Sequence, residues 1–225
     1  MKRWICLSVL ILSGVFFRKQ DTAGRKSLFM PVNRSVLDVA QKRKDWNGLI
    51  SGFKASDLVF LDESGCNTDM TRRYAYSLGG SRTVDSAPLS KPKNTTILSS
   101  IQLDGTLRYT TFSGGTTVER FKRYLETDLL PHLNGNSVLI MDNMKSHHAK
   151  AVKNLLDSSE IRYISLPPYS PDLNPIEKLW SKVKSFLRKF KARTLDALPN
   201  AIQNAFHSVT ISDCSGWFRF CGYAL

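Results

Sequence analysis

The chain has 225 residues, 42% of them hydrophobic, which is enough for one domain with a substantial core. It has neither internal repeats nor low-complexity tracts, which excludes a repeat architecture. Its 32 lysines and arginines against 19 aspartates and glutamates give a formal net charge of +13. An excess of this size favours a polyanionic partner, most commonly nucleic acid, although charge alone leaves a solvated lysine-rich surface as the alternative.

The N-terminal residues imitate a secretory signal without completing one. Lys2 and Arg3 precede an apolar stretch of about fourteen residues, shorter than the ~20 that span a bilayer, and no small-residue cleavage site follows. We interpret residues 1–15 as a buried lead-in or as a consequence of the chosen start codon, and we expect no membrane association. The four cysteines lack the two-residue spacing of a zinc or redox motif, which predicts free thiols in a reducing compartment.

The first predicted elements are a helix and a buried strand. Residues 34–50 are predicted to form a charged, amphipathic helix with Val36, Val39 and Trp46 as its apolar anchors. Residues 57–63 (DLVFLDE) are a short apolar run that ends in charge. This pattern is typical of a strand buried in a sheet.

A hairpin and a helix are predicted next. Residues 94–102 and 106–112 are rich in β-branched and aromatic side chains, which favours two strands. Asp104 and Gly105 between them are a strong signal for a hairpin turn. Residues 117–130 follow as a helix, because apolar residues recur on one side at helical spacing and a proline ends the pattern.

The second half of the chain alternates strands with helices. We predict a strand over residues 137–142, a helix over 147–158, a strand over 162–166 and, after a proline-rich loop, a helix that starts at Pro175. The order of three strands, helix, strand, helix, strand, helix predicts a mixed five-stranded sheet flanked by helices. This is the element order of the ribonuclease-H-like α/β fold. In open α/β sheets, ligands bind beyond the carboxyl ends of the strands.

Three carboxylates are the candidate catalytic and metal-binding residues. Asp62 ends the apolar run LVFL, Asp142 ends VLIM, and Glu177 lies in PPYSPDLNPIEKLW, with residues 143–176 between the last two. Two acidic residues at strand ends and a third on a following helix can converge on one point and hold two divalent cations. Such a pair cuts or joins phosphodiester bonds. Strand alternation sends Glu63 to the opposite face, so we assign the ligand role to Asp62.

Glu177 has a second interpretation, because Asn174, Pro175 and Glu177 fit a capping box at the start of a helix. Two features argue against a role for Glu177 as a cap alone. The preceding loop is elaborate, and the helix has a sharply defined apolar side with Glu177 at its edge. Lys184 and Arg188 continue this edge at helical spacing, which makes them candidate DNA-binding residues. An ordinary solvated basic face would have the same pattern.

The loop after Asp142 supplies the remaining candidates. Asn143 and His147 are predicted to contact DNA, and either His147 or His148 could orient a phosphate or a water molecule. A surface histidine at a helix start is the alternative. A zinc site is not expected, because neither the cysteines nor a second histidine cluster has ligand spacing.

These sequence blocks resemble the catalytic domain of DDE-type transposases, and in particular the bacterial insertion-sequence branch of the mariner superfamily. The likeness covers roughly residues 34–210 and is carried by LVFLDESGCNTDMTRRYAYSLGGSR, VLIMDNMKSHHAKAV and PPYSPDLNPIEKLWSKVK. Position by position, Asp62, Asp142 and Glu177 match the family's metal-binding triad. The resemblance implies Mg²⁺ as cofactor with Mn²⁺ as a substitute, hydrolysis that frees the ends of the element, and transesterification that joins them to target DNA.

The resemblance also implies an organisation. Residues 51–210 would be the catalytic domain, residues 1–50 a lead-in and linker helix without a complete DNA-binding helix-turn-helix, and residues 211–225 a C-terminal tail. The aromatic residues of this tail could pack on the core or serve a partner, and we favour packing on the core. The implied partners are element ends and target DNA, a second copy of the chain on the DNA, and a separately encoded N-terminal DNA-binding part. The expected location is cytoplasmic, with the nucleoid. A nuclease that cuts without joining, and an inactive DNA-binding remnant of a transposase, are the alternatives.

Overall fold

The computed structural model describes residues 37–72, 77, 79, 81–86, 88 and 92–223. The lead-in predicted over residues 1–15 and the predicted anchor Val36 lie outside the described residues. The chain divides into a unit Met1–Val32 and a unit Asn33–Leu225, and the fold described below belongs to the second. Within the described part, no helix has the length and apolar character that crossing a membrane requires.

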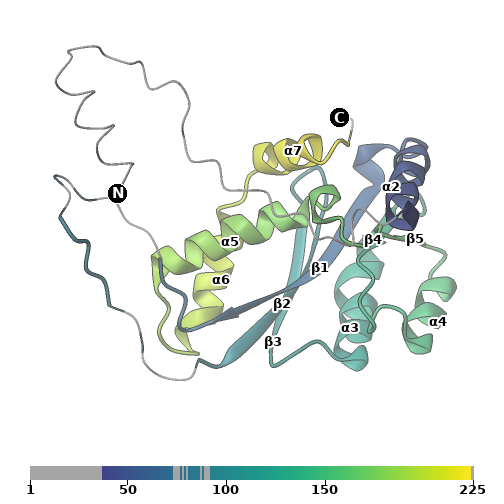
Figure 1. The fold of residues 1–225 in the computed structure, drawn as a ribbon. Coiled ribbons are helices and arrows are strands. Elements are labelled where there is room, and N and C mark those ends of the chain that lie inside the picture. The colour runs from purple at the N-terminus through teal and green to yellow at the C-terminus, as the bar shows by residue number, and fades with distance from the viewer. Residues whose placement is uncertain are drawn as a thin grey trace, which may run out of the picture. The chain divides into compact units, whose positions relative to one another are not determined.

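A five-stranded mixed sheet forms the centre of the fold (Figure 1). Its strands in chain order are β1 (Leu58–Asn67), β2 (Asn94–Ile101), β3 (Leu107–Ser113), β4 (Val138–Met141) and β5 (Arg162–Ser165). Their spatial order is β3-β2-β1-β4-β5, in which β1 to β3 pair antiparallel whereas β4 pairs parallel with both β1 and β5. The predicted mixed sheet is confirmed.

Helices cover both faces of this sheet (Figure 1). On one face lie α3 (Val118–Tyr124), which continues as a π turn (Leu125–Leu129) and a 3-10 turn (Leu130–His132), and α4 (Lys150–Ser158). On the other face lie α2 (Leu37–Ile50), α5 (Ile176–Phe190), α6 (Ala197–His207) and α7 (Ile211–Phe220). Two short 3-10 turns, Ala55–Asp57 and Pro171–Leu173, precede β1 and α5.

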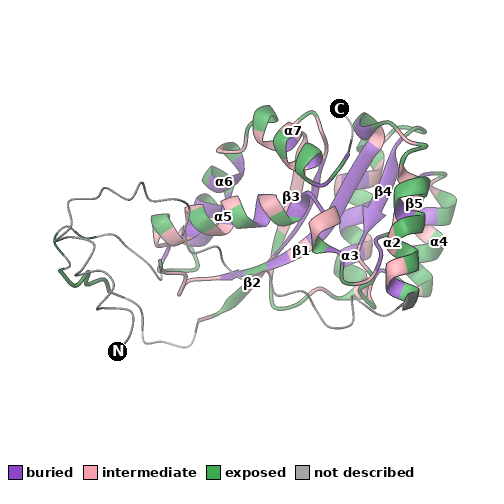
Figure 2. Cartoon of the chain, turned by 45° about the horizontal axis from the view of Figure 1, so that its top comes forward, coloured by how far each residue is buried: buried purple, intermediate pink, exposed green. Residues whose placement is uncertain are grey.

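Each face of the sheet has its own hydrophobic cluster. Phe60 of β1 belongs to the cluster with Trp180 of α5, whereas Val59 and Leu61 belong to the cluster with Phe121 of α3. Side chains alternate along a strand, so consecutive residues of β1 are buried on opposite faces. The first four residues of β1 and all of β4 are therefore apolar and buried, as the buried colouring of these strands in Figure 2 shows.

Most predicted boundaries differ from those observed by a residue or two, and two differences have a clear structural cause. The strand predicted over residues 57–63 extends to Asn67, because β1 pairs with β2 over its whole second half. The helix predicted over residues 147–158 begins later, because the chain first makes a turn in which the His147 N–H donates to the Met144 carbonyl at 3.0 Å.

Helices α6 and α7 were not predicted. Gly216, in the middle of α7, disfavours a helix. Pro199 lies in the first turn of α6, where a proline is tolerated because the N–H it lacks would have no intrahelical partner. Burial of one side stabilises both helices. A local signal existed for α7, since Thr210 and Asp213 form a capping box at its start.

Packing of α7 on the core leads to a prediction about stability. Phe218 is fully buried, and its ring meets Phe60 edge-on with centroids 5.4 Å apart. Phe218→Ala is expected to lower the free energy of unfolding by about 3–5 kcal/mol in urea denaturation, because it leaves a cavity in the core. Phe220→Ala is the control on the same helix: Phe220 is 67% exposed, and its ring lies 3.8 Å from the Lys178 ammonium. That variant is expected to lose less than about 1 kcal/mol, and equal losses would contradict the packing of α7.

Candidate active site

Asp62 and Asp142 are neighbours because β1 and β4 are parallel and adjacent. The register pairs Leu61 with Met141, so the residue after each member of the pair is a carboxylate at the same level of the sheet. Asp62 is 9% exposed, whereas 44% of the Asp142 side chain is exposed. Both carboxylates thus stand where ligands bind in open α/β sheets, beyond the paired part of parallel strands.

Two hydrogen bonds hold the Asp62 carboxylate. The backbone N–H of Glu63 donates to Oδ1 at 2.8 Å, and the indole N–H of Trp180 donates to Oδ2 at 3.2 Å. Burial raises the pKa of Asp62 to about 7; the Glu63 N–H works against this, and the charges of Asp142 and Glu177 add to it. Negative charge is therefore concentrated at this point, and a bound cation would relieve the repulsion.

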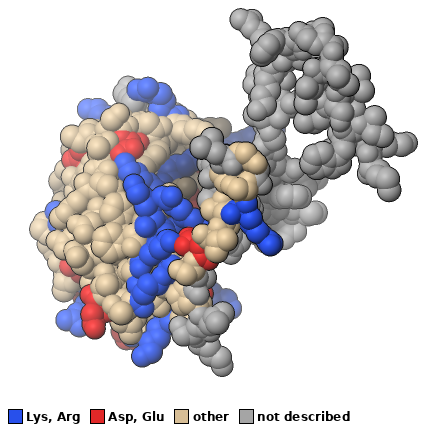
Figure 3. Space-filling view, turned by 90° about the vertical axis from the view of Figure 1, so that its left-hand side faces the viewer, with Lys and Arg blue, Asp and Glu red and all other residues tan. Residues whose placement is uncertain are grey.

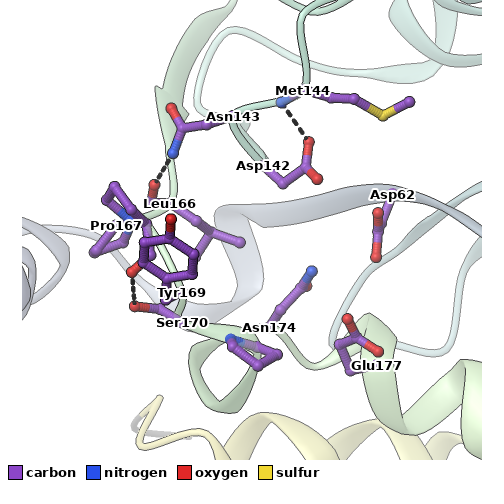
Figure 4. Close-up of a pocket in the computed structure, with 12 residues that line it drawn as sticks. Asp62, Asp142, Asn143, Met144, Leu166, Pro167, Tyr169, Ser170, Asn174 and Glu177 are labelled. Atoms are coloured by element: carbon purple, nitrogen blue, oxygen red, sulfur yellow. Dashed lines mark hydrogen bonds between the residues drawn. The ribbon is translucent and has the colours of Figure 1, made fainter. Parts of the chain in front are cut away.

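Glu177 reaches the same place from the first turn of α5. A pocket of about 450 Å³ is lined by Asp62, Asp142 and Glu177, with residues 166–171 of the proline-rich loop as a further wall (Figure 4). The start of α5 has no side-chain capping hydrogen bond, so the capping-box interpretation of Glu177 is wrong. Partial burial raises the pKa of Glu177, and the Lys184 ammonium works against this shift.

Asn174 completes the wall of the pocket and was considered in the sequence only as a cap. Its side chain points toward the carboxylates in Figure 4 and is 3% exposed. Among the described residues, its amide oxygen Oδ1 has no hydrogen-bond partner. A buried amide oxygen in this position is suited to accept a hydrogen bond from a bound molecule or to ligate a cation.

His147 holds Asp142 from the side opposite to the pocket. Its Nδ1 lies 2.9 Å from Oδ1 of Asp142, and its Nε2 lies 3.1 Å from Oε1 of Glu63. Burial lowers the pKa of His147, but the hydrogen bonds to Asp142 and Glu63 outweigh it and raise the pKa to about 10. Burial alone would raise the pKa of Asp142. The hydrogen bond and charge of His147 outweigh burial, so the pKa of Asp142 lies below its usual value. Because His147 is 2% exposed, the alternative of a surface histidine is wrong. The contact of His147 with DNA stays a prediction.

The other predicted residues lie around the rim. Asn143 is exposed, lines the pocket and donates from Nδ2 to the Leu166 carbonyl at 2.6 Å, which ties the loop after β4 to the proline-rich loop. Lys184 is half-buried on the Glu177 side of α5, and Arg188 follows one turn later. Glu63 was missed as a site residue: alternation correctly placed it on the far face, but no local pattern indicated the histidine that meets it there.

Distant parts of the chain anchor the proline-rich loop. Arg43 of α2 contacts the Ser170 hydroxyl and donates to the Asp172 carboxylate at 2.7 Å. The hydroxyl of Tyr223, beyond α7, donates to the Leu173 carbonyl at 2.5 Å. These contacts determine where α5 begins and therefore where Glu177 is presented.

Asp62 and His147 are both expected to make the metal-free protein less stable as pH rises. Folded Asp62 keeps its proton up to about pH 7 but loses it near 3.8 when unfolded, so stability falls between these values. Folded His147 keeps its proton up to about pH 10, against 6.5 when unfolded, so a second fall lies between those values. Each slope is at most about 1.4 kcal/mol per pH unit.

The measurement is urea unfolding in a chelating buffer from pH 4.5 to 9. Asp62→Asn should flatten the lower part of the profile and His147→Gln the upper part, because each removes one titrating group. A parent profile that rises between pH 5 and 7 would contradict the protonation of Asp62.

Comparison with known proteins places this geometry in a family. The family described as DDE superfamily endonuclease matches residues 57–199. The chain is 28% identical over 97 residues to the transposable element Tc1 transposase of Caenorhabditis elegans, which covers 41% of this chain and 36% of the relative. It is 29% identical over 75 residues to the Tcb2 transposase of Caenorhabditis briggsae, covering 33% and 28%. The chain thus spans about a third of the length of these curated relatives.

Solved structures share the fold. A pre-cleavage Mos1 transpososome chain superposes with a TM-score of 0.73 at 16% identity, covering 96% of this chain and 66% of that chain. The catalytic domain of Mos1 mariner transposase gives 0.58 at 15% identity, covering 80% and 86%. This likeness confirms the ribonuclease-H-like fold. Since the family match extends over more than half of the sequence and includes all three carboxylates, the chain belongs to the DDE superfamily endonuclease family.

Proposed function

We propose that this chain carries the catalytic domain of a transposase, which cleaves DNA strands at the ends of a mobile element and transfers them to target DNA. One observation carries the proposal: Asp62, Asp142 and Glu177, from β1, the end of β4 and α5, line a single pocket. Family membership and the Tc1 and Tcb2 relatives support it.

The donor set of the pocket fits a hard divalent cation. Three carboxylates and the unpaired amide oxygen of Asn174 offer only oxygen ligands, which suits Mg²⁺ and Mn²⁺. In the proposal Asp62, Asp142 and Glu177 hold Mg²⁺, and Mn²⁺ substitutes for it. Bound there, divalent cations would activate the attacking hydroxyl and stabilise the leaving oxygen.

The protein's own residues hold the reacting groups in place. Trp180 and the Glu63 N–H fix the orientation of Asp62, and Asn174 Oδ1 is placed to accept a hydrogen bond from the attacking water or hydroxyl. In cleavage, the water oxygen bonds to phosphorus, and the bond to the 3′ oxygen breaks to leave a 3′-hydroxyl and a 5′-phosphate. In joining, that 3′-hydroxyl attacks a target phosphate and displaces its 3′ oxygen. No covalent protein intermediate is required.

Basic residues near the pocket are proposed to bind the DNA backbone. Lys184 and Arg188 follow Glu177 along α5, and Asn143 lies on the opposite rim of the pocket. Figure 3 shows lysine and arginine side chains gathered in a band on the face that looks to the left in Figure 1. Such a band, with a net charge of +13, supports sequence-independent contact with phosphates.

The finer assignments rest on the sequence blocks. We propose the bacterial insertion-sequence branch, a catalytic domain over residues 51–210, and a second copy of the chain on the DNA, because two element ends must be handled together. We also propose a separately encoded part that reads the ends, and an enzyme located with the nucleoid in the cytoplasm.

The proposal predicts metal-dependent nicking that depends on the triad. Purified protein is expected to nick supercoiled plasmid with Mg²⁺ or Mn²⁺, and Asp62→Ala, Asp142→Ala and Glu177→Ala should each reduce the rate at least ~100-fold while remaining folded. Asp157→Ala, which removes a carboxylate of α4 outside the pocket, is the control and should retain the rate.

A labelled oligonucleotide with a free 3′-hydroxyl then tests joining to the plasmid. Nicking without joining would favour a nuclease over a transposase. A parent protein that neither nicks DNA nor binds Mn²⁺ would contradict the proposed function.

A further inference from the structure

We propose that His147, held in turn by Glu63, is a positioning residue that fixes the Asp142 carboxylate for cation binding. The proposal rests on the proposed function, since it assigns Asp142 to the cation site. It gives a role to two residues that lie outside the catalytic pocket and that the triad does not include.

The contacts leave one oxygen of Asp142 for the pocket. Oδ1 of Asp142 accepts a hydrogen bond from the Met144 N–H at 3.0 Å and also contacts His147 Nδ1 at 2.9 Å. The same Nδ1 lies 3.2 Å from the Asp142 carbonyl oxygen. With Oδ1 held from two directions, the carboxylate cannot rotate without breaking both contacts, and Oδ2 remains to meet a ligand.

Residues on the far side of the sheet hold the imidazole ring of His147. Its Nε2 lies 3.1 Å from Oε1 of Glu63, and the Phe121 ring of α3 stacks on it with centroids 4.2 Å apart. Because Asp62 and Glu63 are consecutive in β1, they point to opposite faces. One dipeptide thus supplies a carboxylate to the pocket on one face and a support for Asp142 on the other.

Hydrogen bonding explains this cluster better than metal ligation. Glu63, Asp142 and His147 place one candidate ligand atom each within 4.8 Å of one another. However, both ring nitrogens already contact carboxylate oxygens at hydrogen-bond distance, and the Phe121 ring covers one face of the imidazole. A cation would have to displace one of these contacts at His147, whose side chain is only 1% exposed.

Stability alone does not explain why the cluster is charged. The Glu63 side chain is 7% exposed, and its Oε2 has no hydrogen-bond partner among the described residues. Buried ionic groups are often matched or exceeded in stability by apolar residues of similar volume. The presence of the buried Glu63 carboxylate beside His147, with one oxygen lacking a hydrogen bond among the described residues, is better explained by its role in orienting Asp142.

The test uses substitutions that separate the two ring nitrogens. His147→Asn places its amide N–H close to the position of Nδ1 and keeps a donor for Asp142, whereas His147→Gln reaches toward Glu63 and loses that donor. His147→Phe keeps the aromatic ring against Phe121 and removes both nitrogens. His132→Phe, at an exposed histidine that belongs neither to the pocket nor to the Glu63–Asp142–His147 cluster, is the control.

The readout is the affinity of the metal-free protein for Mn²⁺, measured by electron paramagnetic resonance, with thermal unfolding to verify the fold. His147→Phe and His147→Gln are expected to bind Mn²⁺ about 10–100-fold more weakly than the parent, as for residues that orient metal ligands. His147→Asn should stay within a few-fold of the parent, and His132→Phe should be unchanged. Plasmid nicking at limiting Mn²⁺ should follow the same order.

The outcomes are distinguishable. If the parent binds Mn²⁺ and folded His147→Phe binds it equally well, the positioning role is wrong and the proposed function stands. If His147→Phe does not fold, equal affinities of His147→Asn and His147→Gln overturn the role instead. A parent that fails to bind Mn²⁺ overturns both this inference and the cation site on which it rests.

Discussion

The parallel pairing of β1 with β4 is the constraint on which the site depends. Its register brings Leu61 beside Met141, and this alone makes Asp62 and Asp142 neighbours although eighty positions of sequence separate them. The pairing is maintained by apolar side chains on both faces of each strand, because helices cover both sides of the sheet. Burial of Asp62 and, to a lesser degree, the neighbouring charge of Asp142 raise the pKa of Asp62.

The third carboxylate depends on a different kind of restraint. Glu177 is presented by a loop that is itself irregular, and this loop is tied to α2 through Arg43, to the segment after α7 through Tyr223 and to the loop after β4 through Asn143. The elements that bracket the described fold therefore act on the site, although neither contributes a carboxylate.

How far the sequence could predict the protein follows from the range of the interactions. Apolar runs that end in carboxylates are local patterns, so the sheet and the convergence of Asp62 and Asp142 could be predicted from the sequence. The contact of Glu63 with His147 joins residues 84 positions apart, and alternation predicts the face of Glu63 but not its partner. Helices α6 and α7 depend on burial against the core, and in α7 this burial overrides the weak helix propensity of Gly216. Asn174 was interpreted as a helix cap because the local sequence pattern carries no information on the tertiary contacts that bury it in the pocket wall.

Anomalous diffraction from crystals grown with Mn²⁺ shows whether the pocket between the three carboxylates is a cation site. We expect anomalous peaks in this pocket, within about 2.0–2.4 Å of carboxylate oxygens of Asp62, Asp142 and Glu177, and a retained hydrogen bond between His147 and Asp142. Peaks located instead between Glu63 and His147, or an absence of peaks at saturating Mn²⁺, would contradict this expectation.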